Sequence, residues 1–377
     1  MADDPHRCEY VVPRKKRQCR MLTKKGNQFC GEHLVHDPNN STRIVCPNDS
    51  SHTVKQKDLE DHLKRCNARL PEAAWIRKDE FRRPDDEEIN AVVKLIDAAY
   101  EAVEKEVVHL PARSFYEQHM KAEAERSQRK DKQLVQFASI IDHLNEHDLL
   151  RNSDDSLLID LGSGKAQLIY WMTKCAPDCN YLLIDRMGTR NKFDRKGRPH
   201  PKLKITRLLC SIEHLDMSKV PIVEKCKDQA TIVCKHFCGN ATDAGIRCIE
   251  NGIQSGVKFV AFALIPCCHH KCTFEEFVGR EFLETVGIKT AADFSALRHV
   301  STWATCKFPD LDPSTATGQL NAKKLEWGRR AKRTIEVARA AFLRTLGYRV
   351  QLYEYVDAEI SPENLLILGE RIQQTAD

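Results

Sequence analysis

Residues 157–165 read Leu-Leu-Ile-Asp-Leu-Gly-Ser-Gly-Lys. A short apolar run ending in an acid predicts a buried strand, and the two glycines permit a tight turn that approaches a ligand closely. The apolar stretch from Leu168 to Cys175 then predicts a helix. A strand, a glycine turn and a helix in this order are typical of a doubly wound α/β domain.

The same alternation continues toward the end of the chain. Short apolar runs predict four further strands, at Tyr181–Asp185, Ile205–Cys210, Ala230–Lys235 and Val257–Ile265. Two more, Tyr348–Tyr355 and Asn364–Leu368, have only a turn between them. Such alternation favours a parallel sheet covered on both faces, and a closing hairpin is the arrangement of class I methyltransferases. We predict an α/β, Rossmann-like class I methyltransferase fold with a seven-stranded, mostly parallel sheet.

The glycine turn distinguishes between two cofactors. A dinucleotide-binding turn requires a third glycine at position 167, where this chain has Gln167. An acid before Gly-x-Gly is instead the methyltransferase pattern, in which Asp160 approaches the cationic methionine moiety of S-adenosylmethionine. Asp185 ends the next strand, where it can accept both ribose hydroxyls. We predict S-adenosylmethionine rather than a nicotinamide cofactor. The alternative is an ordinary strand–turn–helix that has no role in cofactor binding. The predicted contacts are Asp160, Gly162, Ser163, Gly164, Asp185 and Ile212.

Five of the sixteen cysteines lie in the first 66 residues, each close to another Cys or a His. The N-terminus has no signal-peptide character, so clustered Cys and His favour metal binding over disulfides. The first set is Cys8, Cys19, Cys30 and His33, spaced x10, x10 and x2. Three Cys and one His form a known zinc-binding set. Unliganded thiols on a disordered arm are the alternative.

The second set is Cys46, His52, His62 and Cys66. Apolar residues four positions apart predict a helix over residues 57–66, which places His62 and Cys66 on one face. Neither set has enough apolar sequence around it for a core, so metal binding would supply much of the folding free energy. We predict two structural Zn²⁺ ions.

The composition divides the chain into four parts. The connector begins as a basic linker, and two helical stretches follow, one after Pro84 and one from Pro111 to about Leu150. We predict a CCCH zinc finger at 1–37, a CHHC zinc finger at 42–68, a linker and helical connector at 69–149, and a methyltransferase domain at 150–377.

The distribution of charge favours nucleic acid more than the net charge of +5 does. Nine Lys or Arg oppose one acid between Arg186 and Arg207, and six oppose one between Lys323 and Arg333. Such patches suit phosphate backbones, with solvated surface charge as the alternative. The apolar runs are far shorter than the roughly 20 residues of a membrane span. We expect an intracellular protein of the nucleus, the cytoplasm or both, without membrane contact and with no evident obligatory protein partner.

Two polar segments end the fourth and fifth predicted strands, where an open α/β sheet binds its substrate. Residues 235–243 read Lys-His-Phe-Cys-Gly-Asn-Ala-Thr-Asp, and residues 266–272 read Pro-Cys-Cys-His-His-Lys-Cys. The second segment is also a possible third zinc site, although neighbours on a strand point to opposite faces. Its potential ligands are Cys267, Cys268, His269, His270 and Cys272.

These segments, the two zinc modules in this order and the closing Ser-Pro-Glu-Asn at 361–364 resemble a known family over nearly the whole chain. The chain is similar to the eukaryotic tRNA 2′-O-ribose methyltransferases of the acceptor stem. The resemblance implies that the substrate is the 2′-hydroxyl of the fourth nucleotide in tRNAs for glycine, proline and histidine.

The polar segments also fit this chemistry directly. A ribose hydroxyl is a poor nucleophile, so an enzyme must align it with the sulfonium methyl group and help to remove its proton. Lys235 is our first candidate, because its ammonium group can lower the pKa of the hydroxyl or stabilise a developing alkoxide. His236 or His270 could act as the base, and Glu363 could orient the lysine. A salt-bridged surface lysine and a turn-capping glutamate are the structural alternatives.

Two basic segments are predicted to hold the RNA, since double-stranded RNA is recognised largely through its shape and phosphates. The loop after Asp185 supplies Arg195, Lys196 and Arg198. A helix running to about Leu346 supplies a second set, consisting of Arg329, Arg330, Lys332 and Arg333. The sequence leaves two other functions open: an RNA-binding adaptor with a non-catalytic methyltransferase fold, and a methyltransferase acting on a base or a protein.

Overall fold

The structure is a computed structural model, and it divides into two units, Met1–Phe81 and Arg82–Asp377. The described residues are 6–12, 17–66, 83–112, 114–122, 125, 131–188, 193, 203–226, 229–306, 308 and 311–372.

The first unit consists of two small modules. In one, β1 (Val11–Val12) pairs with β2 (Arg17–Gln18), and the short 3₁₀ helix η2 (Leu34–His36) follows. In the other, β3 (Arg43–Cys46) pairs with β4 (Asp49–Lys55), which leads through η3 (Gln56–Asp58) into α1 (Leu59–Arg65). The buried cluster of the first module is formed by three cysteines, so the unit has little apolar core.

The two modules contact each other through Glu32, which lies between Cys30 and His33. Its carboxylate forms an ion pair with Arg43, at 3.3 Å between Nη2 and Oε1. The backbone N–H of Thr53 donates to the same carboxylate at 3.0 Å. A cavity of about 750 Å³ opens beside this contact, and cations from both modules line it: Lys24, Arg43, Lys55 and Lys57.

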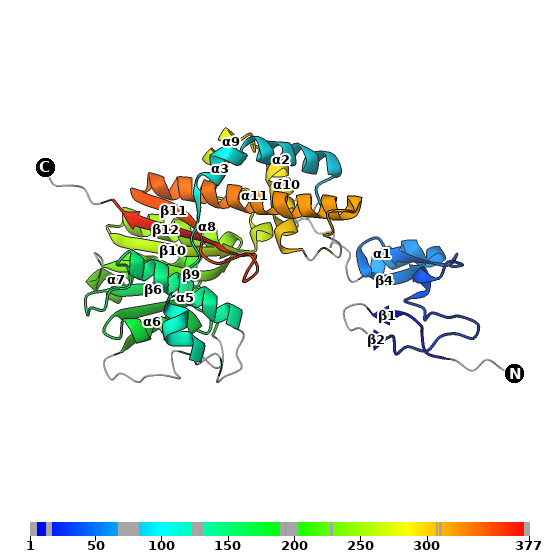
Figure 1. The fold of residues 1–377 in the computed structure, drawn as a ribbon, viewed down its shortest axis with the longest axis horizontal. Helices are drawn as coiled ribbons and strands as arrows, with labels where there is room; N and C mark the ends of the chain where they lie inside the picture. Colours follow the sequence, from blue (N-terminus) through cyan, green and yellow to red (C-terminus); the bar gives the residue numbers. More distant parts are fainter. Residues whose placement is uncertain are drawn as a thin grey trace. The chain divides into compact units, whose positions relative to one another are not determined.

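The second unit is built on one eight-stranded sheet (Figure 1). Its order is β5-β11-β12-β10-β9-β6-β7-β8, and only β12 runs antiparallel to its neighbours. The strands are β5 (Val107–His109), β6 (Leu157–Leu161), β7 (Asn180–Asp185), β8 (Lys204–Leu209), β9 (Ala230–Cys238), β10 (Phe259–Cys267), β11 (Tyr348–Glu354) and β12 (Leu365–Arg371). All seven predicted strands are present. The eighth, β5, comes from the connector and extends the sheet beside β11.

Helices cover both faces of the sheet, as the apolar character of its strands requires. On one face, Leu158 and Val233 pack in a core with α5 (Asp131–Glu146) and α6 (Gln167–Cys175). On the other, Leu157 and Ile232 pack with α7 (Pro221–Lys225), α8 (Asn240–Gln254) and α11 (Ala316–Thr345). Successive residues of a strand therefore serve opposite cores, in keeping with the period of two.

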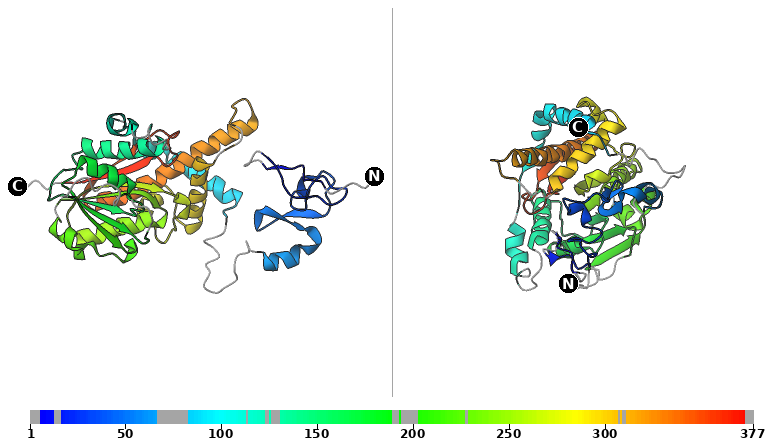
Figure 2. Two further views of the ribbon diagram at one scale, coloured as in Figure 1. Left: turned by 90° about the horizontal axis from the view of Figure 1, so that it is seen from below. Right: turned by 90° about the vertical axis from the view of Figure 1, so that its right-hand side faces the viewer.

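A third core lies outside α11, where a further layer of helices packs on it (Figures 1 and 2). The layer comprises α2 (Asp86–Ala98), α9 (Arg280–Thr285) and α10 (Ala291–Ser301). The helix predicted after Pro84 begins with a capping box, in which Asp85 and Glu88 each accept a hydrogen bond from the other's backbone N–H. The remaining elements are α3 (Tyr100–Glu104), the π-helix η5 (Tyr116–Met120) and the 3₁₀ helices η7 (Ile212–His214), η8 (Met217–Lys219), η9 (His269–Lys271) and η10 (Thr302–Thr305).

Among the described helices, none combines the length and the apolar composition that crossing a membrane requires.

Candidate active site and metal centres

The eight predicted zinc ligands form two clusters in the first unit. Within each cluster, one donor atom from every residue lies within 4.8 Å of the others. In the first module, the Sγ atoms of Cys8 and Cys30 lie 3.5 and 3.4 Å from Nδ1 of His33, and Cys19 completes the set. Zinc bonds of about 2.0–2.3 Å in a tetrahedron place ligand atoms roughly 3.4–3.8 Å apart, so this donor set fits the ion.

The second cluster combines two strand residues with two helix residues. Cys46 Sγ lies 3.2 Å from His62 Nε2 and 3.8 Å from Cys66 Sγ, and the Nε2 atoms of His52 and His62 are 3.2 Å apart. His62 and Cys66 approach from α1 and its C-terminal cap, as the helical spacing predicts. This donor set also fits a closed zinc site.

The glycine turn after β6 is anchored to the next strand. The backbone N–H groups of Gly162 and Ser163 both donate to the carbonyl of Ile184, at 2.9 and 3.0 Å. Gly162 and Gly164 have φ angles of +74° and +47°, in the left-handed region that favours glycine. The turn therefore presents backbone rather than side chains at the carboxyl edge of the sheet.

Asp185, at the end of β7, lies beside this turn. Its Oδ2 accepts from the N–H of Gly164 at 2.7 Å, and its Oδ1 accepts from the N–H of Met187 at 2.9 Å. Arg207 of β8 donates to Ser163 Oγ at 2.9 Å and to the carbonyl of Gly164. Sequence reasoning assigned Arg207 to a basic RNA-binding stretch and missed this role, because only the pairing of β7 with β8 brings it to the turn.

Asp160 is a buried carboxyl, only 4% exposed. Burial raises its pKa to about 8 and Asp185 adds to that shift, although the Arg207 guanidinium opposes it. A buried carboxyl of this kind is stabilised in its ionised form by a cationic ligand. The methionine end of S-adenosylmethionine carries an ammonium and a sulfonium group, so the residues present fit that cofactor.

Ile212 follows β8 as the first residue of η7. The chain enters this segment beside Asp185, since the N–H of Cys210 donates to the Asp185 carbonyl at 3.2 Å. Ile212 lines a cavity of about 520 Å³ over α8, together with Asn240 and Cys248.

Lys235 lies near the end of β9 and is 8% exposed. Burial lowers its pKa to about 8, and its Nζ lies 5.1 Å from the centre of the Phe137 ring of α5. Because Val233 pairs with Asp160 and side chains alternate along a strand, Lys235 and Asp160 point to the same face of the sheet. His236 continues β9, and its side chain lies outside the described residues.

His270 and Glu363 occupy the strand-end segments as predicted from the sequence. His270 is an exposed residue of η9, and partial burial together with the Lys271 cation lowers its pKa. Glu363 precedes β12, and its Oε2 lies 2.6 Å from Nζ of Lys332 and 3.6 Å from Nδ1 of His269. Glu363 thus has a lysine partner, Lys332 of α11, that the sequence did not indicate.

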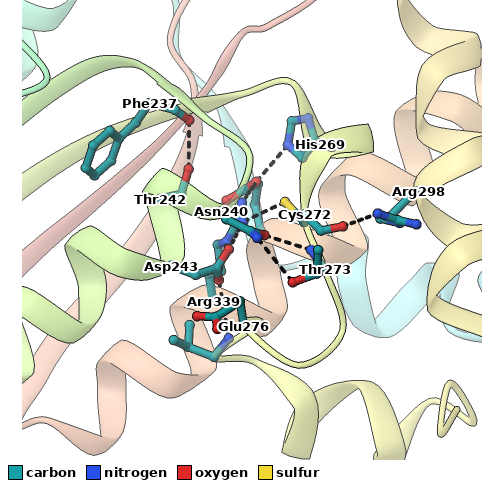
Figure 3. Close-up of polar contacts among 12 residues, drawn as sticks. Phe237, Asn240, Thr242, Asp243, His269, Cys272, Thr273, Glu276, Arg298 and Arg339 are labelled. Carbon is teal, nitrogen blue, oxygen red and sulfur yellow. Dashed lines mark hydrogen bonds and ion pairs between the residues drawn. The ribbon is translucent and has the colours of Figure 1, made fainter. Parts of the chain in front are cut away.

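A buried ion network joins α11 to the strand ends (Figure 3). Arg339 Nη2 lies 2.5 Å from Asp243 of α8, and its Nη1 lies 2.7 Å from Glu336. The other partner of Glu336 is Nε2 of His269, at 2.7 Å. These four side chains are almost fully buried. The network fixes η9 against α11, and sequence reasoning missed it because its members come from three distant segments.

On α11, three of the four residues predicted to form the second RNA contact are engaged in ion pairs within the protein. Arg330 is paired with Asp97 and Glu326 at 2.8 and 3.0 Å, and Arg333 is paired with Glu354 at 2.7 Å. Lys332 is buried against Glu363. Of the four predicted cations, Arg329 is exposed and the other three form intramolecular ion pairs. The other predicted contact, through Arg195, Lys196 and Arg198, lies outside the described residues.

The strand order, with one antiparallel strand near an edge, and an acid–Gly-x-Gly turn followed by a second strand-end acid define a class I S-adenosylmethionine-dependent methyltransferase. A family model described as "Methyltransferase TRM13" matches residues 135–370. Two further models match the modules, a "CCCH zinc finger in TRM13 protein" at 6–34 and a "U11-48K-like CHHC zinc finger" at 43–67. The chain belongs to the TRM13 methyltransferase family.

Curated relatives match over almost their whole length. A mouse protein named "tRNA:m(4)X modification enzyme TRM13 homolog" is 26% identical, with 96% of this chain and 93% of that protein covered. A Yarrowia lipolytica protein named "tRNA:m(4)X modification enzyme TRM13" is 28% identical, with 96% and 89% covered.

Among solved structures, the chain is similar to the antibiotic-resistance methyltransferase Kmr, at 12% identity and a TM-score of 0.31 over 60% of this chain and 91% of that one. It is also similar to human N-acetylserotonin methyltransferase in complex with S-adenosylmethionine, at 9% identity and a TM-score of 0.28 over 74% and 67%.

Proposed function

We propose that this enzyme transfers the methyl group of S-adenosylmethionine to the ribose 2′-hydroxyl of nucleotide 4 in the acceptor stem of tRNA-Gly, tRNA-Pro and tRNA-His. The names of the relatives support tRNA and position 4. The observation that carries the chemistry is the placement of Lys235 and Asp160 on one face, at the ends of paired strands. An acceptor hydroxyl beside Lys235 would lie next to the cofactor turn.

The residues have distinct roles in this proposal. Asp160, Gly162, Ser163, Gly164, Asp185 and Ile212 bind the cofactor, which supplies an electrophilic methyl group when bound. Lys235, held as an ammonium in a largely dry site, lowers the pKa of the hydroxyl and stabilises the charge that develops on its oxygen. His236 and His270 remain the candidate bases, and Glu363 is a positioning residue acting through His269 and Lys332.

We propose that the first unit binds the tRNA. The cavity of about 750 Å³ between its modules is lined by Lys24, Arg43, Lys55 and Lys57, and clustered cations of this kind suit phosphate groups. Our proposed organisation places zinc fingers at 1–37 and 42–68. The packing of α2, α3 and α5 within the second unit supports extending the catalytic domain from 150–377 back to about residue 82.

The test is methyl transfer from labelled S-adenosylmethionine to unmodified tRNA-Gly transcripts that carry ribose or 2′-deoxyribose at nucleotide 4. We expect label on the ribose transcript alone. Equal labelling of both transcripts would remove the 2′-hydroxyl assignment and favour a base. Labelling of neither, with the cofactor bound, would favour the adaptor function or a different substrate. Transcripts of tRNA-Pro, tRNA-His and one tRNA outside this set test the specificity.

A further inference from the structure

Three cysteine thiols meet at the carboxyl edge of the sheet, apart from the eight zinc ligands of the first unit. Cys238 ends β9, Cys267 ends β10, and Cys268 follows directly. Their three Sγ atoms lie within 4.8 Å of one another, and those of Cys238 and Cys267 are 3.0 Å apart. The strand ends meet because β9 and β10 are parallel neighbours, with Cys267 opposite Cys238.

The backbone is shaped to bring the third thiol to the other two. Consecutive strand residues normally point to opposite faces, which would separate Cys267 from Cys268. Cys268 instead has φ +52° and ψ +45°, a left-handed conformation that is unfavourable for any residue other than glycine. Strain of this kind clusters at functional sites, where the surroundings impose it.

Close packing of the two strand-end segments holds this arrangement. Gly239 has φ +58°, and its N–H donates to the carbonyl of Cys267 at 3.0 Å. A Cβ added at Gly239 would lie 2.5 Å from Cβ of Lys271, so no larger residue fits. The N–H of Lys271 donates in turn to the carbonyl of Cys268 at 2.9 Å.

Two other potential ligands of this segment, His269 and Cys272, have partners elsewhere. Nε2 of His269 is bound to Glu336 at 2.7 Å, and Sγ of Cys272 accepts a hydrogen bond from Arg339 at 3.1 Å. The set predicted from the second segment alone therefore does not assemble. Cys238, from the first segment, joins Cys267 and Cys268 instead.

We propose that Cys238, Cys267 and Cys268 form a third metal site, which binds Zn²⁺ through three thiolates and leaves its fourth position to solvent. Thiolates select zinc and other soft ions over Mg²⁺ and Ca²⁺. Cys238 is exposed and Cys268 half-buried, so the site opens to water. Three thiolates and Zn²⁺ carry a net charge of −1. The Lys271 cation stabilises negative charge on both Cys238 and Cys268.

The 3.0 Å between Sγ of Cys238 and Sγ of Cys267 is shorter than the 3.8 Å between Sγ of Cys46 and Sγ of Cys66 in the second module. Zn–S bonds of about 2.3 Å require sulfurs roughly 3.8 Å apart, so Cys238 and Cys267 would separate by about 0.8 Å on binding. Binding displaces the protons that remain on the thiols and involves no change of oxidation state. The bound ion would link the ends of β9 and β10 next to Lys235.

The test is the zinc content of the full-length protein, purified with a phosphine reductant and measured by mass spectrometry of the element. We expect about three ions per chain in the wild type and about two in Cys238→Ser and Cys268→Ser. Cys306→Ser, which removes an exposed cysteine outside the cluster, is the matched control and should keep three. Cobalt substitution should show a thiolate-to-metal absorption band that weakens by about a third in the two cluster variants.

Two outcomes would overturn the site. One is a wild type with two ions, and the other is cluster variants that keep the wild-type content. A peptide pair linked through Cys238 and Cys267 in protein purified without reductant, and separated by dithiothreitol, would assign a redox-active disulfide instead. Circular dichroism of the variants separates loss of one ion from loss of the fold. The count does not depend on methyl transfer, so it is independent of the proposed function.

Discussion

At the scale of single residues, burial of Asp160 has an energetic cost that its proposed contact with the cofactor would offset. An unfolded aspartate has a pKa of about 3.9, whereas burial raises the pKa of Asp160 to about 8. Folding therefore favours the protonated form, and the stability of the ligand-free protein should fall as the pH rises between these two values. A cationic ligand beside the carboxyl reverses this preference.

Asp160→Asn should consequently raise the Tm of the ligand-free protein at pH 7.5 and weaken the binding of S-adenosylmethionine. Loss of a charged partner costs roughly 1.5–3 kcal/mol, or about 10- to 100-fold in Kd. Calorimetry at pH 7 in two buffers of different ionisation enthalpy should show a proton released on binding to the wild type and none with Asp160→Asn. Binding of equal affinity in both proteins would show that Asp160 does not contact the cofactor.

Lys235 gives a second prediction at this scale, and its pKa is shifted in the opposite direction to that of Asp160. Burial lowers its pKa to about 8, so the ammonium form is present below that value and is lost above it. If the ammonium stabilises the developing alkoxide, kcat should fall as the pH rises through about 8. Lys235→Met should reduce kcat by roughly 10²–10³-fold, the cost of removing one oxyanion donor.

Lys235→Arg is the informative companion, because a guanidinium stays charged across this range. Its kcat, although lower, should lose the decline above pH 8. Single-turnover rates with saturating tRNA would measure both profiles. A rate that rises through pH 8 in the wild type would instead make Lys235 the proton acceptor.

At the scale of elements, the strands were predictable and the ion network was not. Each central strand is a continuous apolar run, because both of its faces are buried. The three-residue β5 has no such signal and joins the sheet only through its pairing with β11. The basic stretch of α11 indicated a surface patch, since the acids that neutralise it come from α2, α3 and β11.

The zinc and cofactor motifs were recognisable because their residues are close in sequence or follow strands directly. The structure brings all eight predicted zinc ligands together in the predicted sets, and it places Asp160 and Asp185 around one turn. Arg207 and the Glu336–His269 pair were not recognisable, because strand pairing and helix packing bring them to the site. The group of Cys238, Cys267 and Cys268 falls between these cases, since the sequence analysis noted these cysteines but their grouping depends on the register of β9 and β10.

The network on α11 can be tested by removing its central cation. Arg339→Met would leave Asp243 and Glu336 buried without their partner, which typically costs about 3–5 kcal/mol. We expect a drop of this size in the unfolding free energy, measured with urea. Arg330→Met removes a half-exposed cation from α11 and should cost no more than about 1 kcal/mol. Equal losses of unfolding free energy in both variants would mean that the buried ion pairs of Arg339 do not stabilise the fold more than a half-exposed pair does.

At the scale of the whole molecule, the two units have different sources of stability. The second unit buries three apolar cores around its sheet and helices. In the first unit, the buried cluster of the first module consists of three cysteines with a few apolar neighbours. The fold of this unit should therefore depend on zinc. Binding of S-adenosylmethionine and binding of tRNA should therefore respond differently to loss of a zinc ligand.

Cys66→Ser in the full-length chain separates these two activities. Removing one of four ligands should abolish the second zinc site, unfold β3, β4 and α1, and scatter the cations that line the cavity between the modules. We expect the Kd for S-adenosylmethionine to stay within about twofold of wild type, because its residues lie in the other unit. The Kd for tRNA should rise by roughly tenfold or more, with a weaker salt dependence, since fewer phosphates are neutralised.

Cys306→Ser controls for loss of a thiol, and limited proteolysis of residues 43–67 would report the local unfolding. An unchanged tRNA affinity with a proteolysed module would move tRNA binding entirely to the catalytic unit.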